Sequence, residues 1–282
     1  MRNQYKRHDV FRCKHEAHRD FHNKVSVYYV MYEKQCFPEG CINTIWHCIL
    51  KEKGKRCIKG YNYIGRECKG CTYYKDEKVH LQPELLLSQD EYGTFLSDLE
   101  DFEDWLDSLK NKKLNLRGEI ISVKPWFEED IFADRKLRKL RGYLLVLQNN
   151  FIELTSFEDV LYVRISEKLM KEYGFAPPMV LEYRGEIKVD RGRLVINRPY
   201  SIEVIEGTTQ EVWNRDKALV AVRTATKFIK QVDKCLECPW GCLVDVRDHR
   251  VKKKNFYRNL FCLKAISDWH ECYIRSWESL KK

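Results

Sequence analysis

The chain has 282 residues, of which 44% are hydrophobic and 33% charged, a balance that is ordinary for a globular protein with two or three cores. It lacks a run of about 18 apolar residues, which excludes a helix that crosses a membrane. Its polar start lacks the apolar segment of a secretory signal, so we expect a cytoplasmic protein. In that compartment clustered cysteines more often bind metal than form disulfides.

The net charge of +9 is unevenly distributed along the chain. Residues 1–82 carry +8, residues 83–113 carry −6, residues 114–206 are neutral, and residues 207–282 carry +7. Basic segments attract polyanions such as nucleic acids. Alternatively, these lysines offset the negative charge of thiolate ligands around a metal. The high content of Lys, Glu, Ile and Tyr is typical of thermophiles, whose intracellular proteins also carry disulfides.

Residues 1–82 are predicted to form a cysteine-rich metal-binding module. Weak alternation predicts a strand over residues 25–32, and residues 41–50 fit either a short helix or a buried strand. The segment 51–78 is rich in loop-forming residues. A loop of that length needs an organiser other than a hydrophobic core, and a metal is the natural candidate.

Six cysteines cluster in this module, namely Cys36, Cys41, Cys48, Cys57, Cys68 and Cys71. The most specific element is Cys68-Lys-Gly-Cys71, because this spacing is typical of metal-binding knuckles. The most compact set of four ligands is Cys48, Cys57, Cys68 and Cys71. Disulfides or buried free thiols are the alternatives. Zinc could also use a weaker group, Cys13, His15, His18 and His22, if these are not plain surface residues.

Residues 84–111 have apolar side chains at three- and four-residue steps, which predicts an amphipathic helix. Eight acidic residues lie between Asp90 and Asp107. This acidic face is either simply solvated or a docking surface for a protein partner.

Residues 114–206 have the pattern of three strands, a short helix and two strands. We expect strands at 114–127, 142–150, 159–166, 178–190 and 191–206. The helix is predicted from Ser166, a good N-cap, to Gly174, a good C-terminal stop. This order resembles the OB-fold, a five-stranded Greek-key barrel. The resemblance implies binding of single-stranded nucleic acid.

Basic and aromatic residues of this region are the candidates for nucleic-acid binding. A loop after the first strand is expected to present the five cations, and nearby rings would stack on bases. These residues are Arg135, Lys136, Arg138, Lys139, Arg141, Trp126 and Tyr143. The alternative is that four nearby acids, from Glu128 to Asp134, neutralise the basic run.

Residues 207–282 are predicted to form a helical module, with helices over 208–234 and 255–281. Between them Cys235, Cys238 and Cys242 have a spacing that can aim three sulfurs at one centre. Cys262 is the expected fourth ligand and Cys272 the reserve. If the metal is zinc, His249 or His270 could replace a cysteine. A basic run over 247–254 follows.

The run Cys-x2-Cys-Pro-x-Gly-Cys resembles the ligand motif of some [4Fe–4S] proteins. Molybdopterin-dependent oxidoreductases carry a similar run with a distant fourth cysteine. The resemblance covers about a dozen residues, and it implies cluster ligands but no activity. A [4Fe–4S] cluster is therefore the expected cofactor, with zinc as the alternative.

The sequence thus predicts an α+β protein with a central OB-like barrel between a metal-binding N-terminal module and a helical C-terminal module. The expected domains are 1–82, 83–113, 114–206 and 207–282. No phosphate loop, nucleophile elbow or zinc-hydrolase motif is present, so no catalytic residue is predicted. The leading hypothesis is a metal-containing nucleic-acid-binding protein. An iron–sulfur electron-transfer protein and a non-catalytic adaptor with structural zinc are the alternatives.

Overall fold

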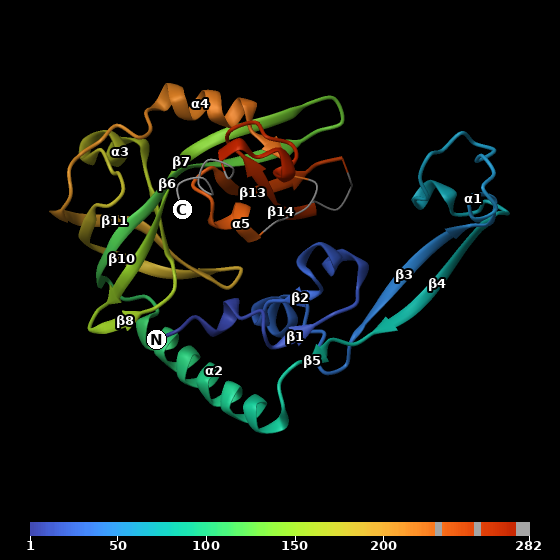
Figure 1. Ribbon diagram of the computed structural model, residues 1–282, viewed down its shortest axis with the longest axis horizontal. Helices are drawn as coiled ribbons and strands as arrows, with labels where there is room; N and C mark the ends of the chain where they lie inside the picture. The colour runs from blue at the N-terminus through green and yellow to red at the C-terminus, as the bar shows by residue number, and fades with distance from the viewer. Residues whose placement is uncertain (229–232, 251–254, 275–282) are drawn as a thin grey trace. The chain divides into compact units, whose positions relative to one another are not determined.

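The computed structural model describes residues 1–228, 233–250 and 255–274 (Figure 1). The chain divides into two compact units. Unit 1 consists of Met1–Arg7 and Gln89–Lys282, and unit 2 consists of His8–Ser88. Unit 2 is therefore an insertion in the sequence of unit 1. None of the described helices has the length and apolar character needed to span a membrane.

Helix α2 (Gln89–Leu109) is the amphipathic helix expected at residues 84–111, and it begins five residues later than predicted. Its buried stripe is formed by Phe95, Leu99, Phe102, Leu106 and Leu109. Apolar residues at three- and four-residue steps share one face of a helix, which explains why this stripe was readable from the sequence. Trp105 stacks on Phe157 of the sheet at a centroid distance of 5.9 Å, which places the helix against unit 1.

A nine-stranded sheet forms the body of unit 1, with the strand order β12-β14-β13-β6-β10-β11-β9-β7-β8. The strands are β6 (Leu114–Ile131), β7 (Lys136–Ile152), β8 (Thr155–Phe157), β9 (Leu161–Ile165), β10 (Val180–Asp190), β11 (Arg193–Glu206), β12 (Thr226–Lys227), β13 (Gly241–Asp248) and β14 (Asn255–Cys262). Each of the five strands expected between residues 114 and 206 is present. The protein is thus a mixed α+β protein with a large sheet.

Strand β6 pairs antiparallel with both β7 and β10, so the sheet does not simply run from one edge to the other. β7 pairs with β9, β9 pairs in parallel with β11, and β11 pairs with β10. These five pairings return to the strand where they began. Buried residues on alternate positions of these strands, such as Leu116, Ile120, Leu145 and Leu147, belong to the main hydrophobic core.

Helix α3 (Glu167–Tyr173) has the ends that the sequence predicts. The hydroxyl of Ser166 accepts a hydrogen bond from the backbone N–H of Leu169, and Gly174 is left-handed with a φ of 56°. The turn between β10 and β11 is a tight hairpin turn, because Arg191 and Gly192 both have positive φ.

Of the two helices predicted for the C-terminal region, the first is partly correct, and the second is wrong over most of its described residues. The described residues of 208–234 contain α4 (Arg215–Thr224), the short strand β12 and the start of α5 (Asp233–Glu237). Residues 255–262 form strand β14, not a helix, and its last three side chains are all buried, so the usual alternation of a strand is absent there. β13 pairs in parallel with β6 and joins the C-terminal residues to the sheet. The helical prediction at Ile229 and Trp277 lies outside the described residues.

Unit 2 contains a three-stranded sheet and a separate two-stranded hairpin. The sheet has the order β2-β1-β5, with β1 (Phe11–Arg12), β2 (Lys24–Val25) and β5 (Glu84–Leu85). The short helical turns are η2 (Glu16–Phe21) and η3 (Tyr29–Glu33). The strand predicted at residues 25–32 is therefore wrong after Val25. The buried residues there, Val25, Val27 and Val30, change from a spacing of two to one of three.

The hairpin of unit 2 consists of β3 (Cys41–Cys48) and β4 (Tyr74–Leu81), which pair over their whole length. Of the two alternatives for residues 41–50, the strand is correct. It is not buried, however, since Ile42 is 69% exposed. Residues 49–73 connect the strands and contain only α1 (Ile49–Glu52) and η4 (Arg66–Cys68).

Candidate nucleic-acid interface

A cavity of about 920 Å³ opens on the sheet of unit 1 and receives side chains from β6, β7, β9, β10 and β11. We call it the basic pocket. Five cations line it, namely Lys113, Arg141, Arg164, Lys188 and Arg198, against the single carboxylate of Glu186. Trp126 and Tyr200 also line it. The pocket thus combines an excess positive charge with two aromatic side chains.

Trp126 is held in place by a cation above its ring. The guanidinium carbon of Arg164 lies 4.7 Å from the ring centroid, a distance typical of a cation–π contact. The same guanidinium donates to Asp190 over 2.7 Å and to the side-chain oxygen of Asn197 over 3.4 Å. Because these bonds fix Arg164, they also fix the orientation of the indole.

The remaining cations of the pocket differ in what they already bind. Arg141 donates twice to Glu128, over 2.7 and 3.0 Å. Lys113, Lys188 and Arg198 are exposed, and none of them has an ion-pair partner among the described residues. These three side chains are therefore free to bind an anionic ligand. In complexes with nucleic acids, lysine and arginine side chains commonly bind phosphate groups.

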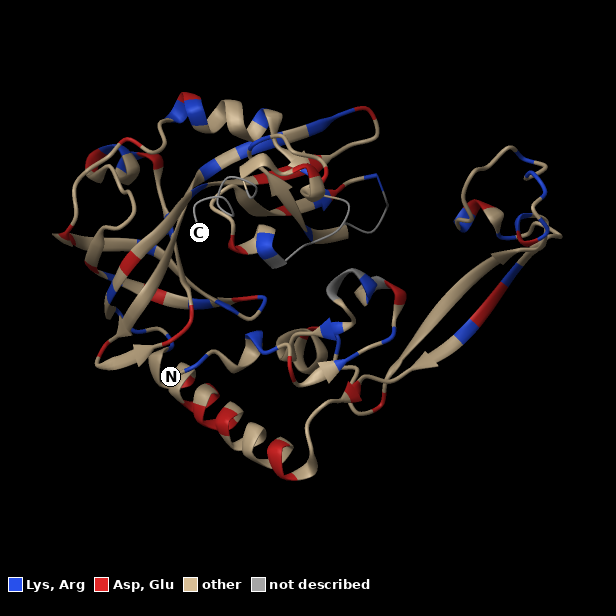
Figure 2. Ribbon diagram, in the orientation of Figure 1, with Lys and Arg blue, Asp and Glu red and all other residues tan. Residues whose placement is uncertain are grey.

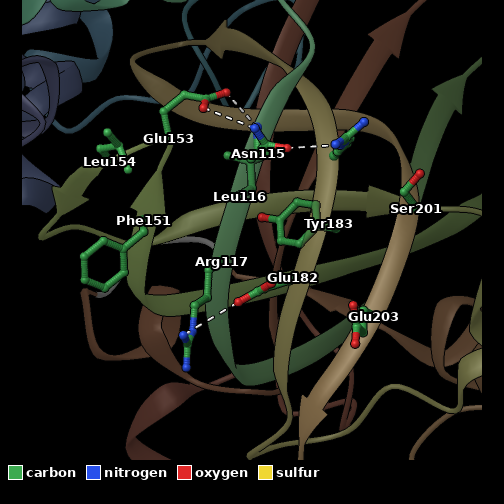
Figure 3. Close-up of a pocket in the computed structure, with 11 residues that line it drawn as sticks. Asn115, Leu116, Arg117, Phe151, Glu153, Leu154, Glu182, Tyr183, Ser201 and Glu203 are labelled. Carbon is green, nitrogen blue, oxygen red and sulfur yellow. Dashed lines mark hydrogen bonds and ion pairs between the residues drawn. The ribbon is translucent and has the colours of Figure 1, made fainter.

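A second cavity in unit 1, of about 780 Å³, lacks this excess of positive charge (Figure 3). Two arginines face three glutamates there, and most of these groups are already bonded to one another. Arg117 lies 3.6 Å from Glu182, and Arg184 donates to Asn115, which in turn donates to Glu153. This cavity is therefore a poor site for a polyanion.

The structure brings only Trp126 and Arg141 of the seven predicted nucleic-acid residues into the basic pocket. The segment 135–141 was expected to be a loop, but β7 begins at Lys136 and pairs with β6. Alternating basic side chains on this strand gave the sequence its polar, loop-like appearance. Arg135, Lys136 and Lys139 are exposed on the hairpin and do not line the pocket.

The side chains of Arg138 and Tyr143 make contacts within the protein and are not available to a ligand. Arg138 donates to Glu129 over 2.9 Å and to the backbone oxygens of Val222 and Ala225. Tyr143 is 1% exposed, so its ring has no face on which a base could stack. Burial also raises the pKa of its hydroxyl.

Most cations of the basic pocket were missed by the sequence predictions. One signal is present on β10, where Glu186 and Lys188 occupy alternate positions and point to one face. This alternation identifies the side chains of β10 that face outward, but it does not show which strands lie next to β10. Arg164 and Arg198 reach the same pocket only because β9 and β11 pair in parallel.

The predicted ligands Cys235, Cys242 and Cys262 are all buried, but they do not lie in one apolar group. Cys235 and Cys262 lie in a small apolar group with Phe228 and Leu260. Cys242 instead belongs to the main core, where its thiol lies 3.3 Å from the backbone oxygen of Pro125. Burial raises the pKa of this thiol to about 11.

A lysine organises the loop that carries these cysteines. The buried Nζ atom of Lys124 donates to the backbone oxygens of Cys238 and Gly241, both over 2.8 Å, and of Leu236 over 3.4 Å. A Cβ atom at Gly241 would collide with the backbone oxygen of Cys235, so only glycine allows the chain to wrap this closely. Three carbonyl groups of this loop therefore surround one ammonium group.

The N-terminal cysteines have a different environment. In the described part of the chain, no three His, Cys, Asp or Glu side chains form a group that could hold a metal ion. All twelve cysteines are free thiols. Among the predicted ligands Cys48, Cys57, Cys68 and Cys71, Cys57 is distinct. Hydrogen bonds from the backbone N–H groups of Lys59 and Tyr61 lower the pKa of its thiol.

No family model, curated protein or solved structure matches this chain. The residues of the basic pocket therefore carry the functional assignment by themselves.

Proposed function

We propose that unit 1 binds single-stranded nucleic acid in the basic pocket. The observation that carries this proposal is the combination of five cations, one carboxylate and two aromatic rings in a single cavity of about 920 Å³. Proteins that bind single strands combine a positive groove, which follows the phosphates, with rings on which bases stack. Trp126 and Tyr200 are the candidate stacking residues, and Lys113, Lys188 and Arg198 are the candidate phosphate contacts.

We also propose that the strands around this pocket form a barrel of the OB type. The cyclic pairing of β6, β7, β9, β11 and β10 supports it, and so does the position of α3 between β9 and β10. This is the element order of the five-stranded Greek-key barrel. Such barrels bind nucleic acids across their strand faces, where the basic pocket lies.

A titration of a labelled single-stranded oligonucleotide at several salt concentrations tests the proposal. The logarithm of the binding constant should fall linearly with the logarithm of salt concentration, because each phosphate contact releases a counterion. Replacing Lys188 and Arg198 together by glutamine should reduce that slope by about 1.4, or about 0.7 for each lost contact. Absence of binding at low salt, or an unchanged slope in the variant, would contradict the proposal.

Metal binding remains a prediction, for which the cysteine-rich segment between β3 and β4 is the better-suited place. Residues 49–73 contribute no side chain to the buried apolar core. Segments without a core need another organiser, and the lowered pKa of Cys57 favours a thiolate there. Analysis of anaerobically purified protein for iron, zinc and sulfide distinguishes a [4Fe–4S] cluster from zinc. Protein free of all three would contradict the prediction.

A further inference from the structure

The connection between β3 and β4 carries the most concentrated positive charge of unit 2 (Figure 2). We call residues 49–73 the basic tip. It contains seven lysines and arginines and two glutamates, a net charge of +5. Six of its cations are exposed, namely Lys53, Lys55, Arg56, Lys59, Arg66 and Lys69.

The charge of the basic tip is not neutralised within the chain. Among the described residues, none of the six exposed cations has an ion-pair partner. One of the two acids, Glu52, is already engaged by His47 over 2.8 Å. Like charges that repel one another without compensation favour the binding of an external polyanion.

Aromatic side chains lie among these cations. The rings of Tyr61 and Tyr63 stack on each other at a centroid distance of 5.7 Å. Tyr63 is nevertheless 56% exposed, and the neighbouring Ile58 is 68% exposed. Gly60 has a φ of +74°, so the chain turns sharply between Ile58 and Tyr61. Exposed rings between unpaired cations are the surface that nucleic-acid bases and phosphates contact together.

We propose that the basic tip is a second nucleic-acid contact, in which the six exposed cations bind phosphates and Tyr63 stacks on an unpaired base. This contact lies in unit 2 and uses none of the residues of the basic pocket. It shares with the proposed function only the class of ligand. The partner is single-stranded nucleic acid, because a base within a duplex does not offer its face to Tyr63.

The test uses the full chain and a fluorescent single-stranded oligonucleotide of DNA or RNA. Replacing Lys55 and Arg56 by glutamine should reduce the salt slope by about 1.4. Tyr63→Ala should weaken binding about tenfold at constant salt. The matched control replaces Lys14 and Lys24, two exposed lysines of unit 2 outside the basic tip, and it should leave both quantities unchanged.

The possible outcomes separate this inference from the proposed function. If the tip variants bind like the unmodified protein while the pocket variant at Lys188 and Arg198 binds more weakly, the second contact does not exist. An equal loss in the control variant overturns it as well, because the effect is then one of net charge alone. If only the tip variants bind more weakly, the tip contact stands and the basic pocket is not the site. Tighter binding to a duplex than to a single strand contradicts stacking on Tyr63.

Discussion

Arg164 lies above the ring of Trp126, with 4.7 Å between its guanidinium carbon and the ring centroid. Asp190 holds that arginine in place and also accepts two hydrogen bonds from Arg258, over 3.0 and 3.1 Å. Arg258 in turn donates to Asp245 of β13 over 2.8 Å. The ring that is proposed to stack on bases is therefore connected by ion pairs to the strands beyond the pocket.

Trp126→Leu should weaken binding of a single-stranded oligonucleotide about tenfold, since loss of one base–aromatic stack costs about 1–3 kcal/mol. Fluorescence anisotropy at constant salt measures the change. Tyr143→Phe is the control, because the ring of Tyr143 is buried and its affinity should equal that of the unmodified protein. The reverse pattern, with loss only in the Tyr143 variant, would place the interface elsewhere.

Arg138→Met should lower the free energy of unfolding by about 3 kcal/mol, because it leaves the buried carboxylate of Glu129 without its partner. Urea denaturation measures this difference. Lys139→Met, one residue away and exposed, should change stability by less than about 0.5 kcal/mol. A stable Arg138 variant that has lost oligonucleotide binding would contradict the structural role.

Because of Lys6, the free energy of unfolding of unit 1 should change with pH in the alkaline range. Burial, together with the nearby Arg193 and Arg258, lowers its pKa from 10.5 to about 8. Between these values the unfolded chain binds more protons than the folded chain, so this residue adds stability as the pH rises from 8 to 10.5. Below that window its charged form is buried at full cost.

Lys6→Met should therefore be more stable than the unmodified protein at pH 7, and its advantage should shrink as the pH rises through that window. Denaturation curves at several pH values measure the difference. The exposed Lys168→Met is the control and should give a difference that does not vary with pH. If the stability difference between Lys6→Met and the unmodified protein also does not vary with pH, the pKa of the Lys6 amine is not lowered in the folded state.

Cys57 should be alkylated by iodoacetamide at neutral pH at least about tenfold faster than Cys242, because the thiolate is the reactive form. Backbone N–H groups lower the pKa of Cys57, and burial raises that of Cys242 to about 11. Mass spectrometry of peptides at timed intervals measures both rates. If Cys57 reacts only after a chelator is added, its sulfur holds a metal. Faster labelling of Cys242 would mean that the core around it opens.

Local signals in the sequence were sufficient for some elements. The ends of α3 follow from Ser166 and Gly174, whose side-chain and backbone preferences act within one turn. The stripe of α2 was equally readable, since a helix with one solvated face repeats its apolar residues regularly.

Other features depend on contacts that sequence spacing does not encode. β14 resembles a helix in sequence because Leu260, Phe261 and Cys262 are all buried, so strand alternation is lost. The spacing of Cys242 did not show that its side chain lies in the main core, nor that Lys124 binds the adjoining loop. The basic pocket combines residues of five strands, and only the pairing of those strands shows that they meet.

The insertion of unit 2 into unit 1 has a consequence for the order of folding. The side chain of Asn3 donates to the backbone oxygen of Gly192 over 3.0 Å, although 189 positions separate the two residues. During synthesis, residues 8–88 are complete long before the partner of Asn3 has been made. Unit 2 can therefore fold first, before residues 1–7 can pack against the rest of unit 1. Loop closure over this distance is slow, so the docking of residues 1–7 should be among the last folding steps of unit 1.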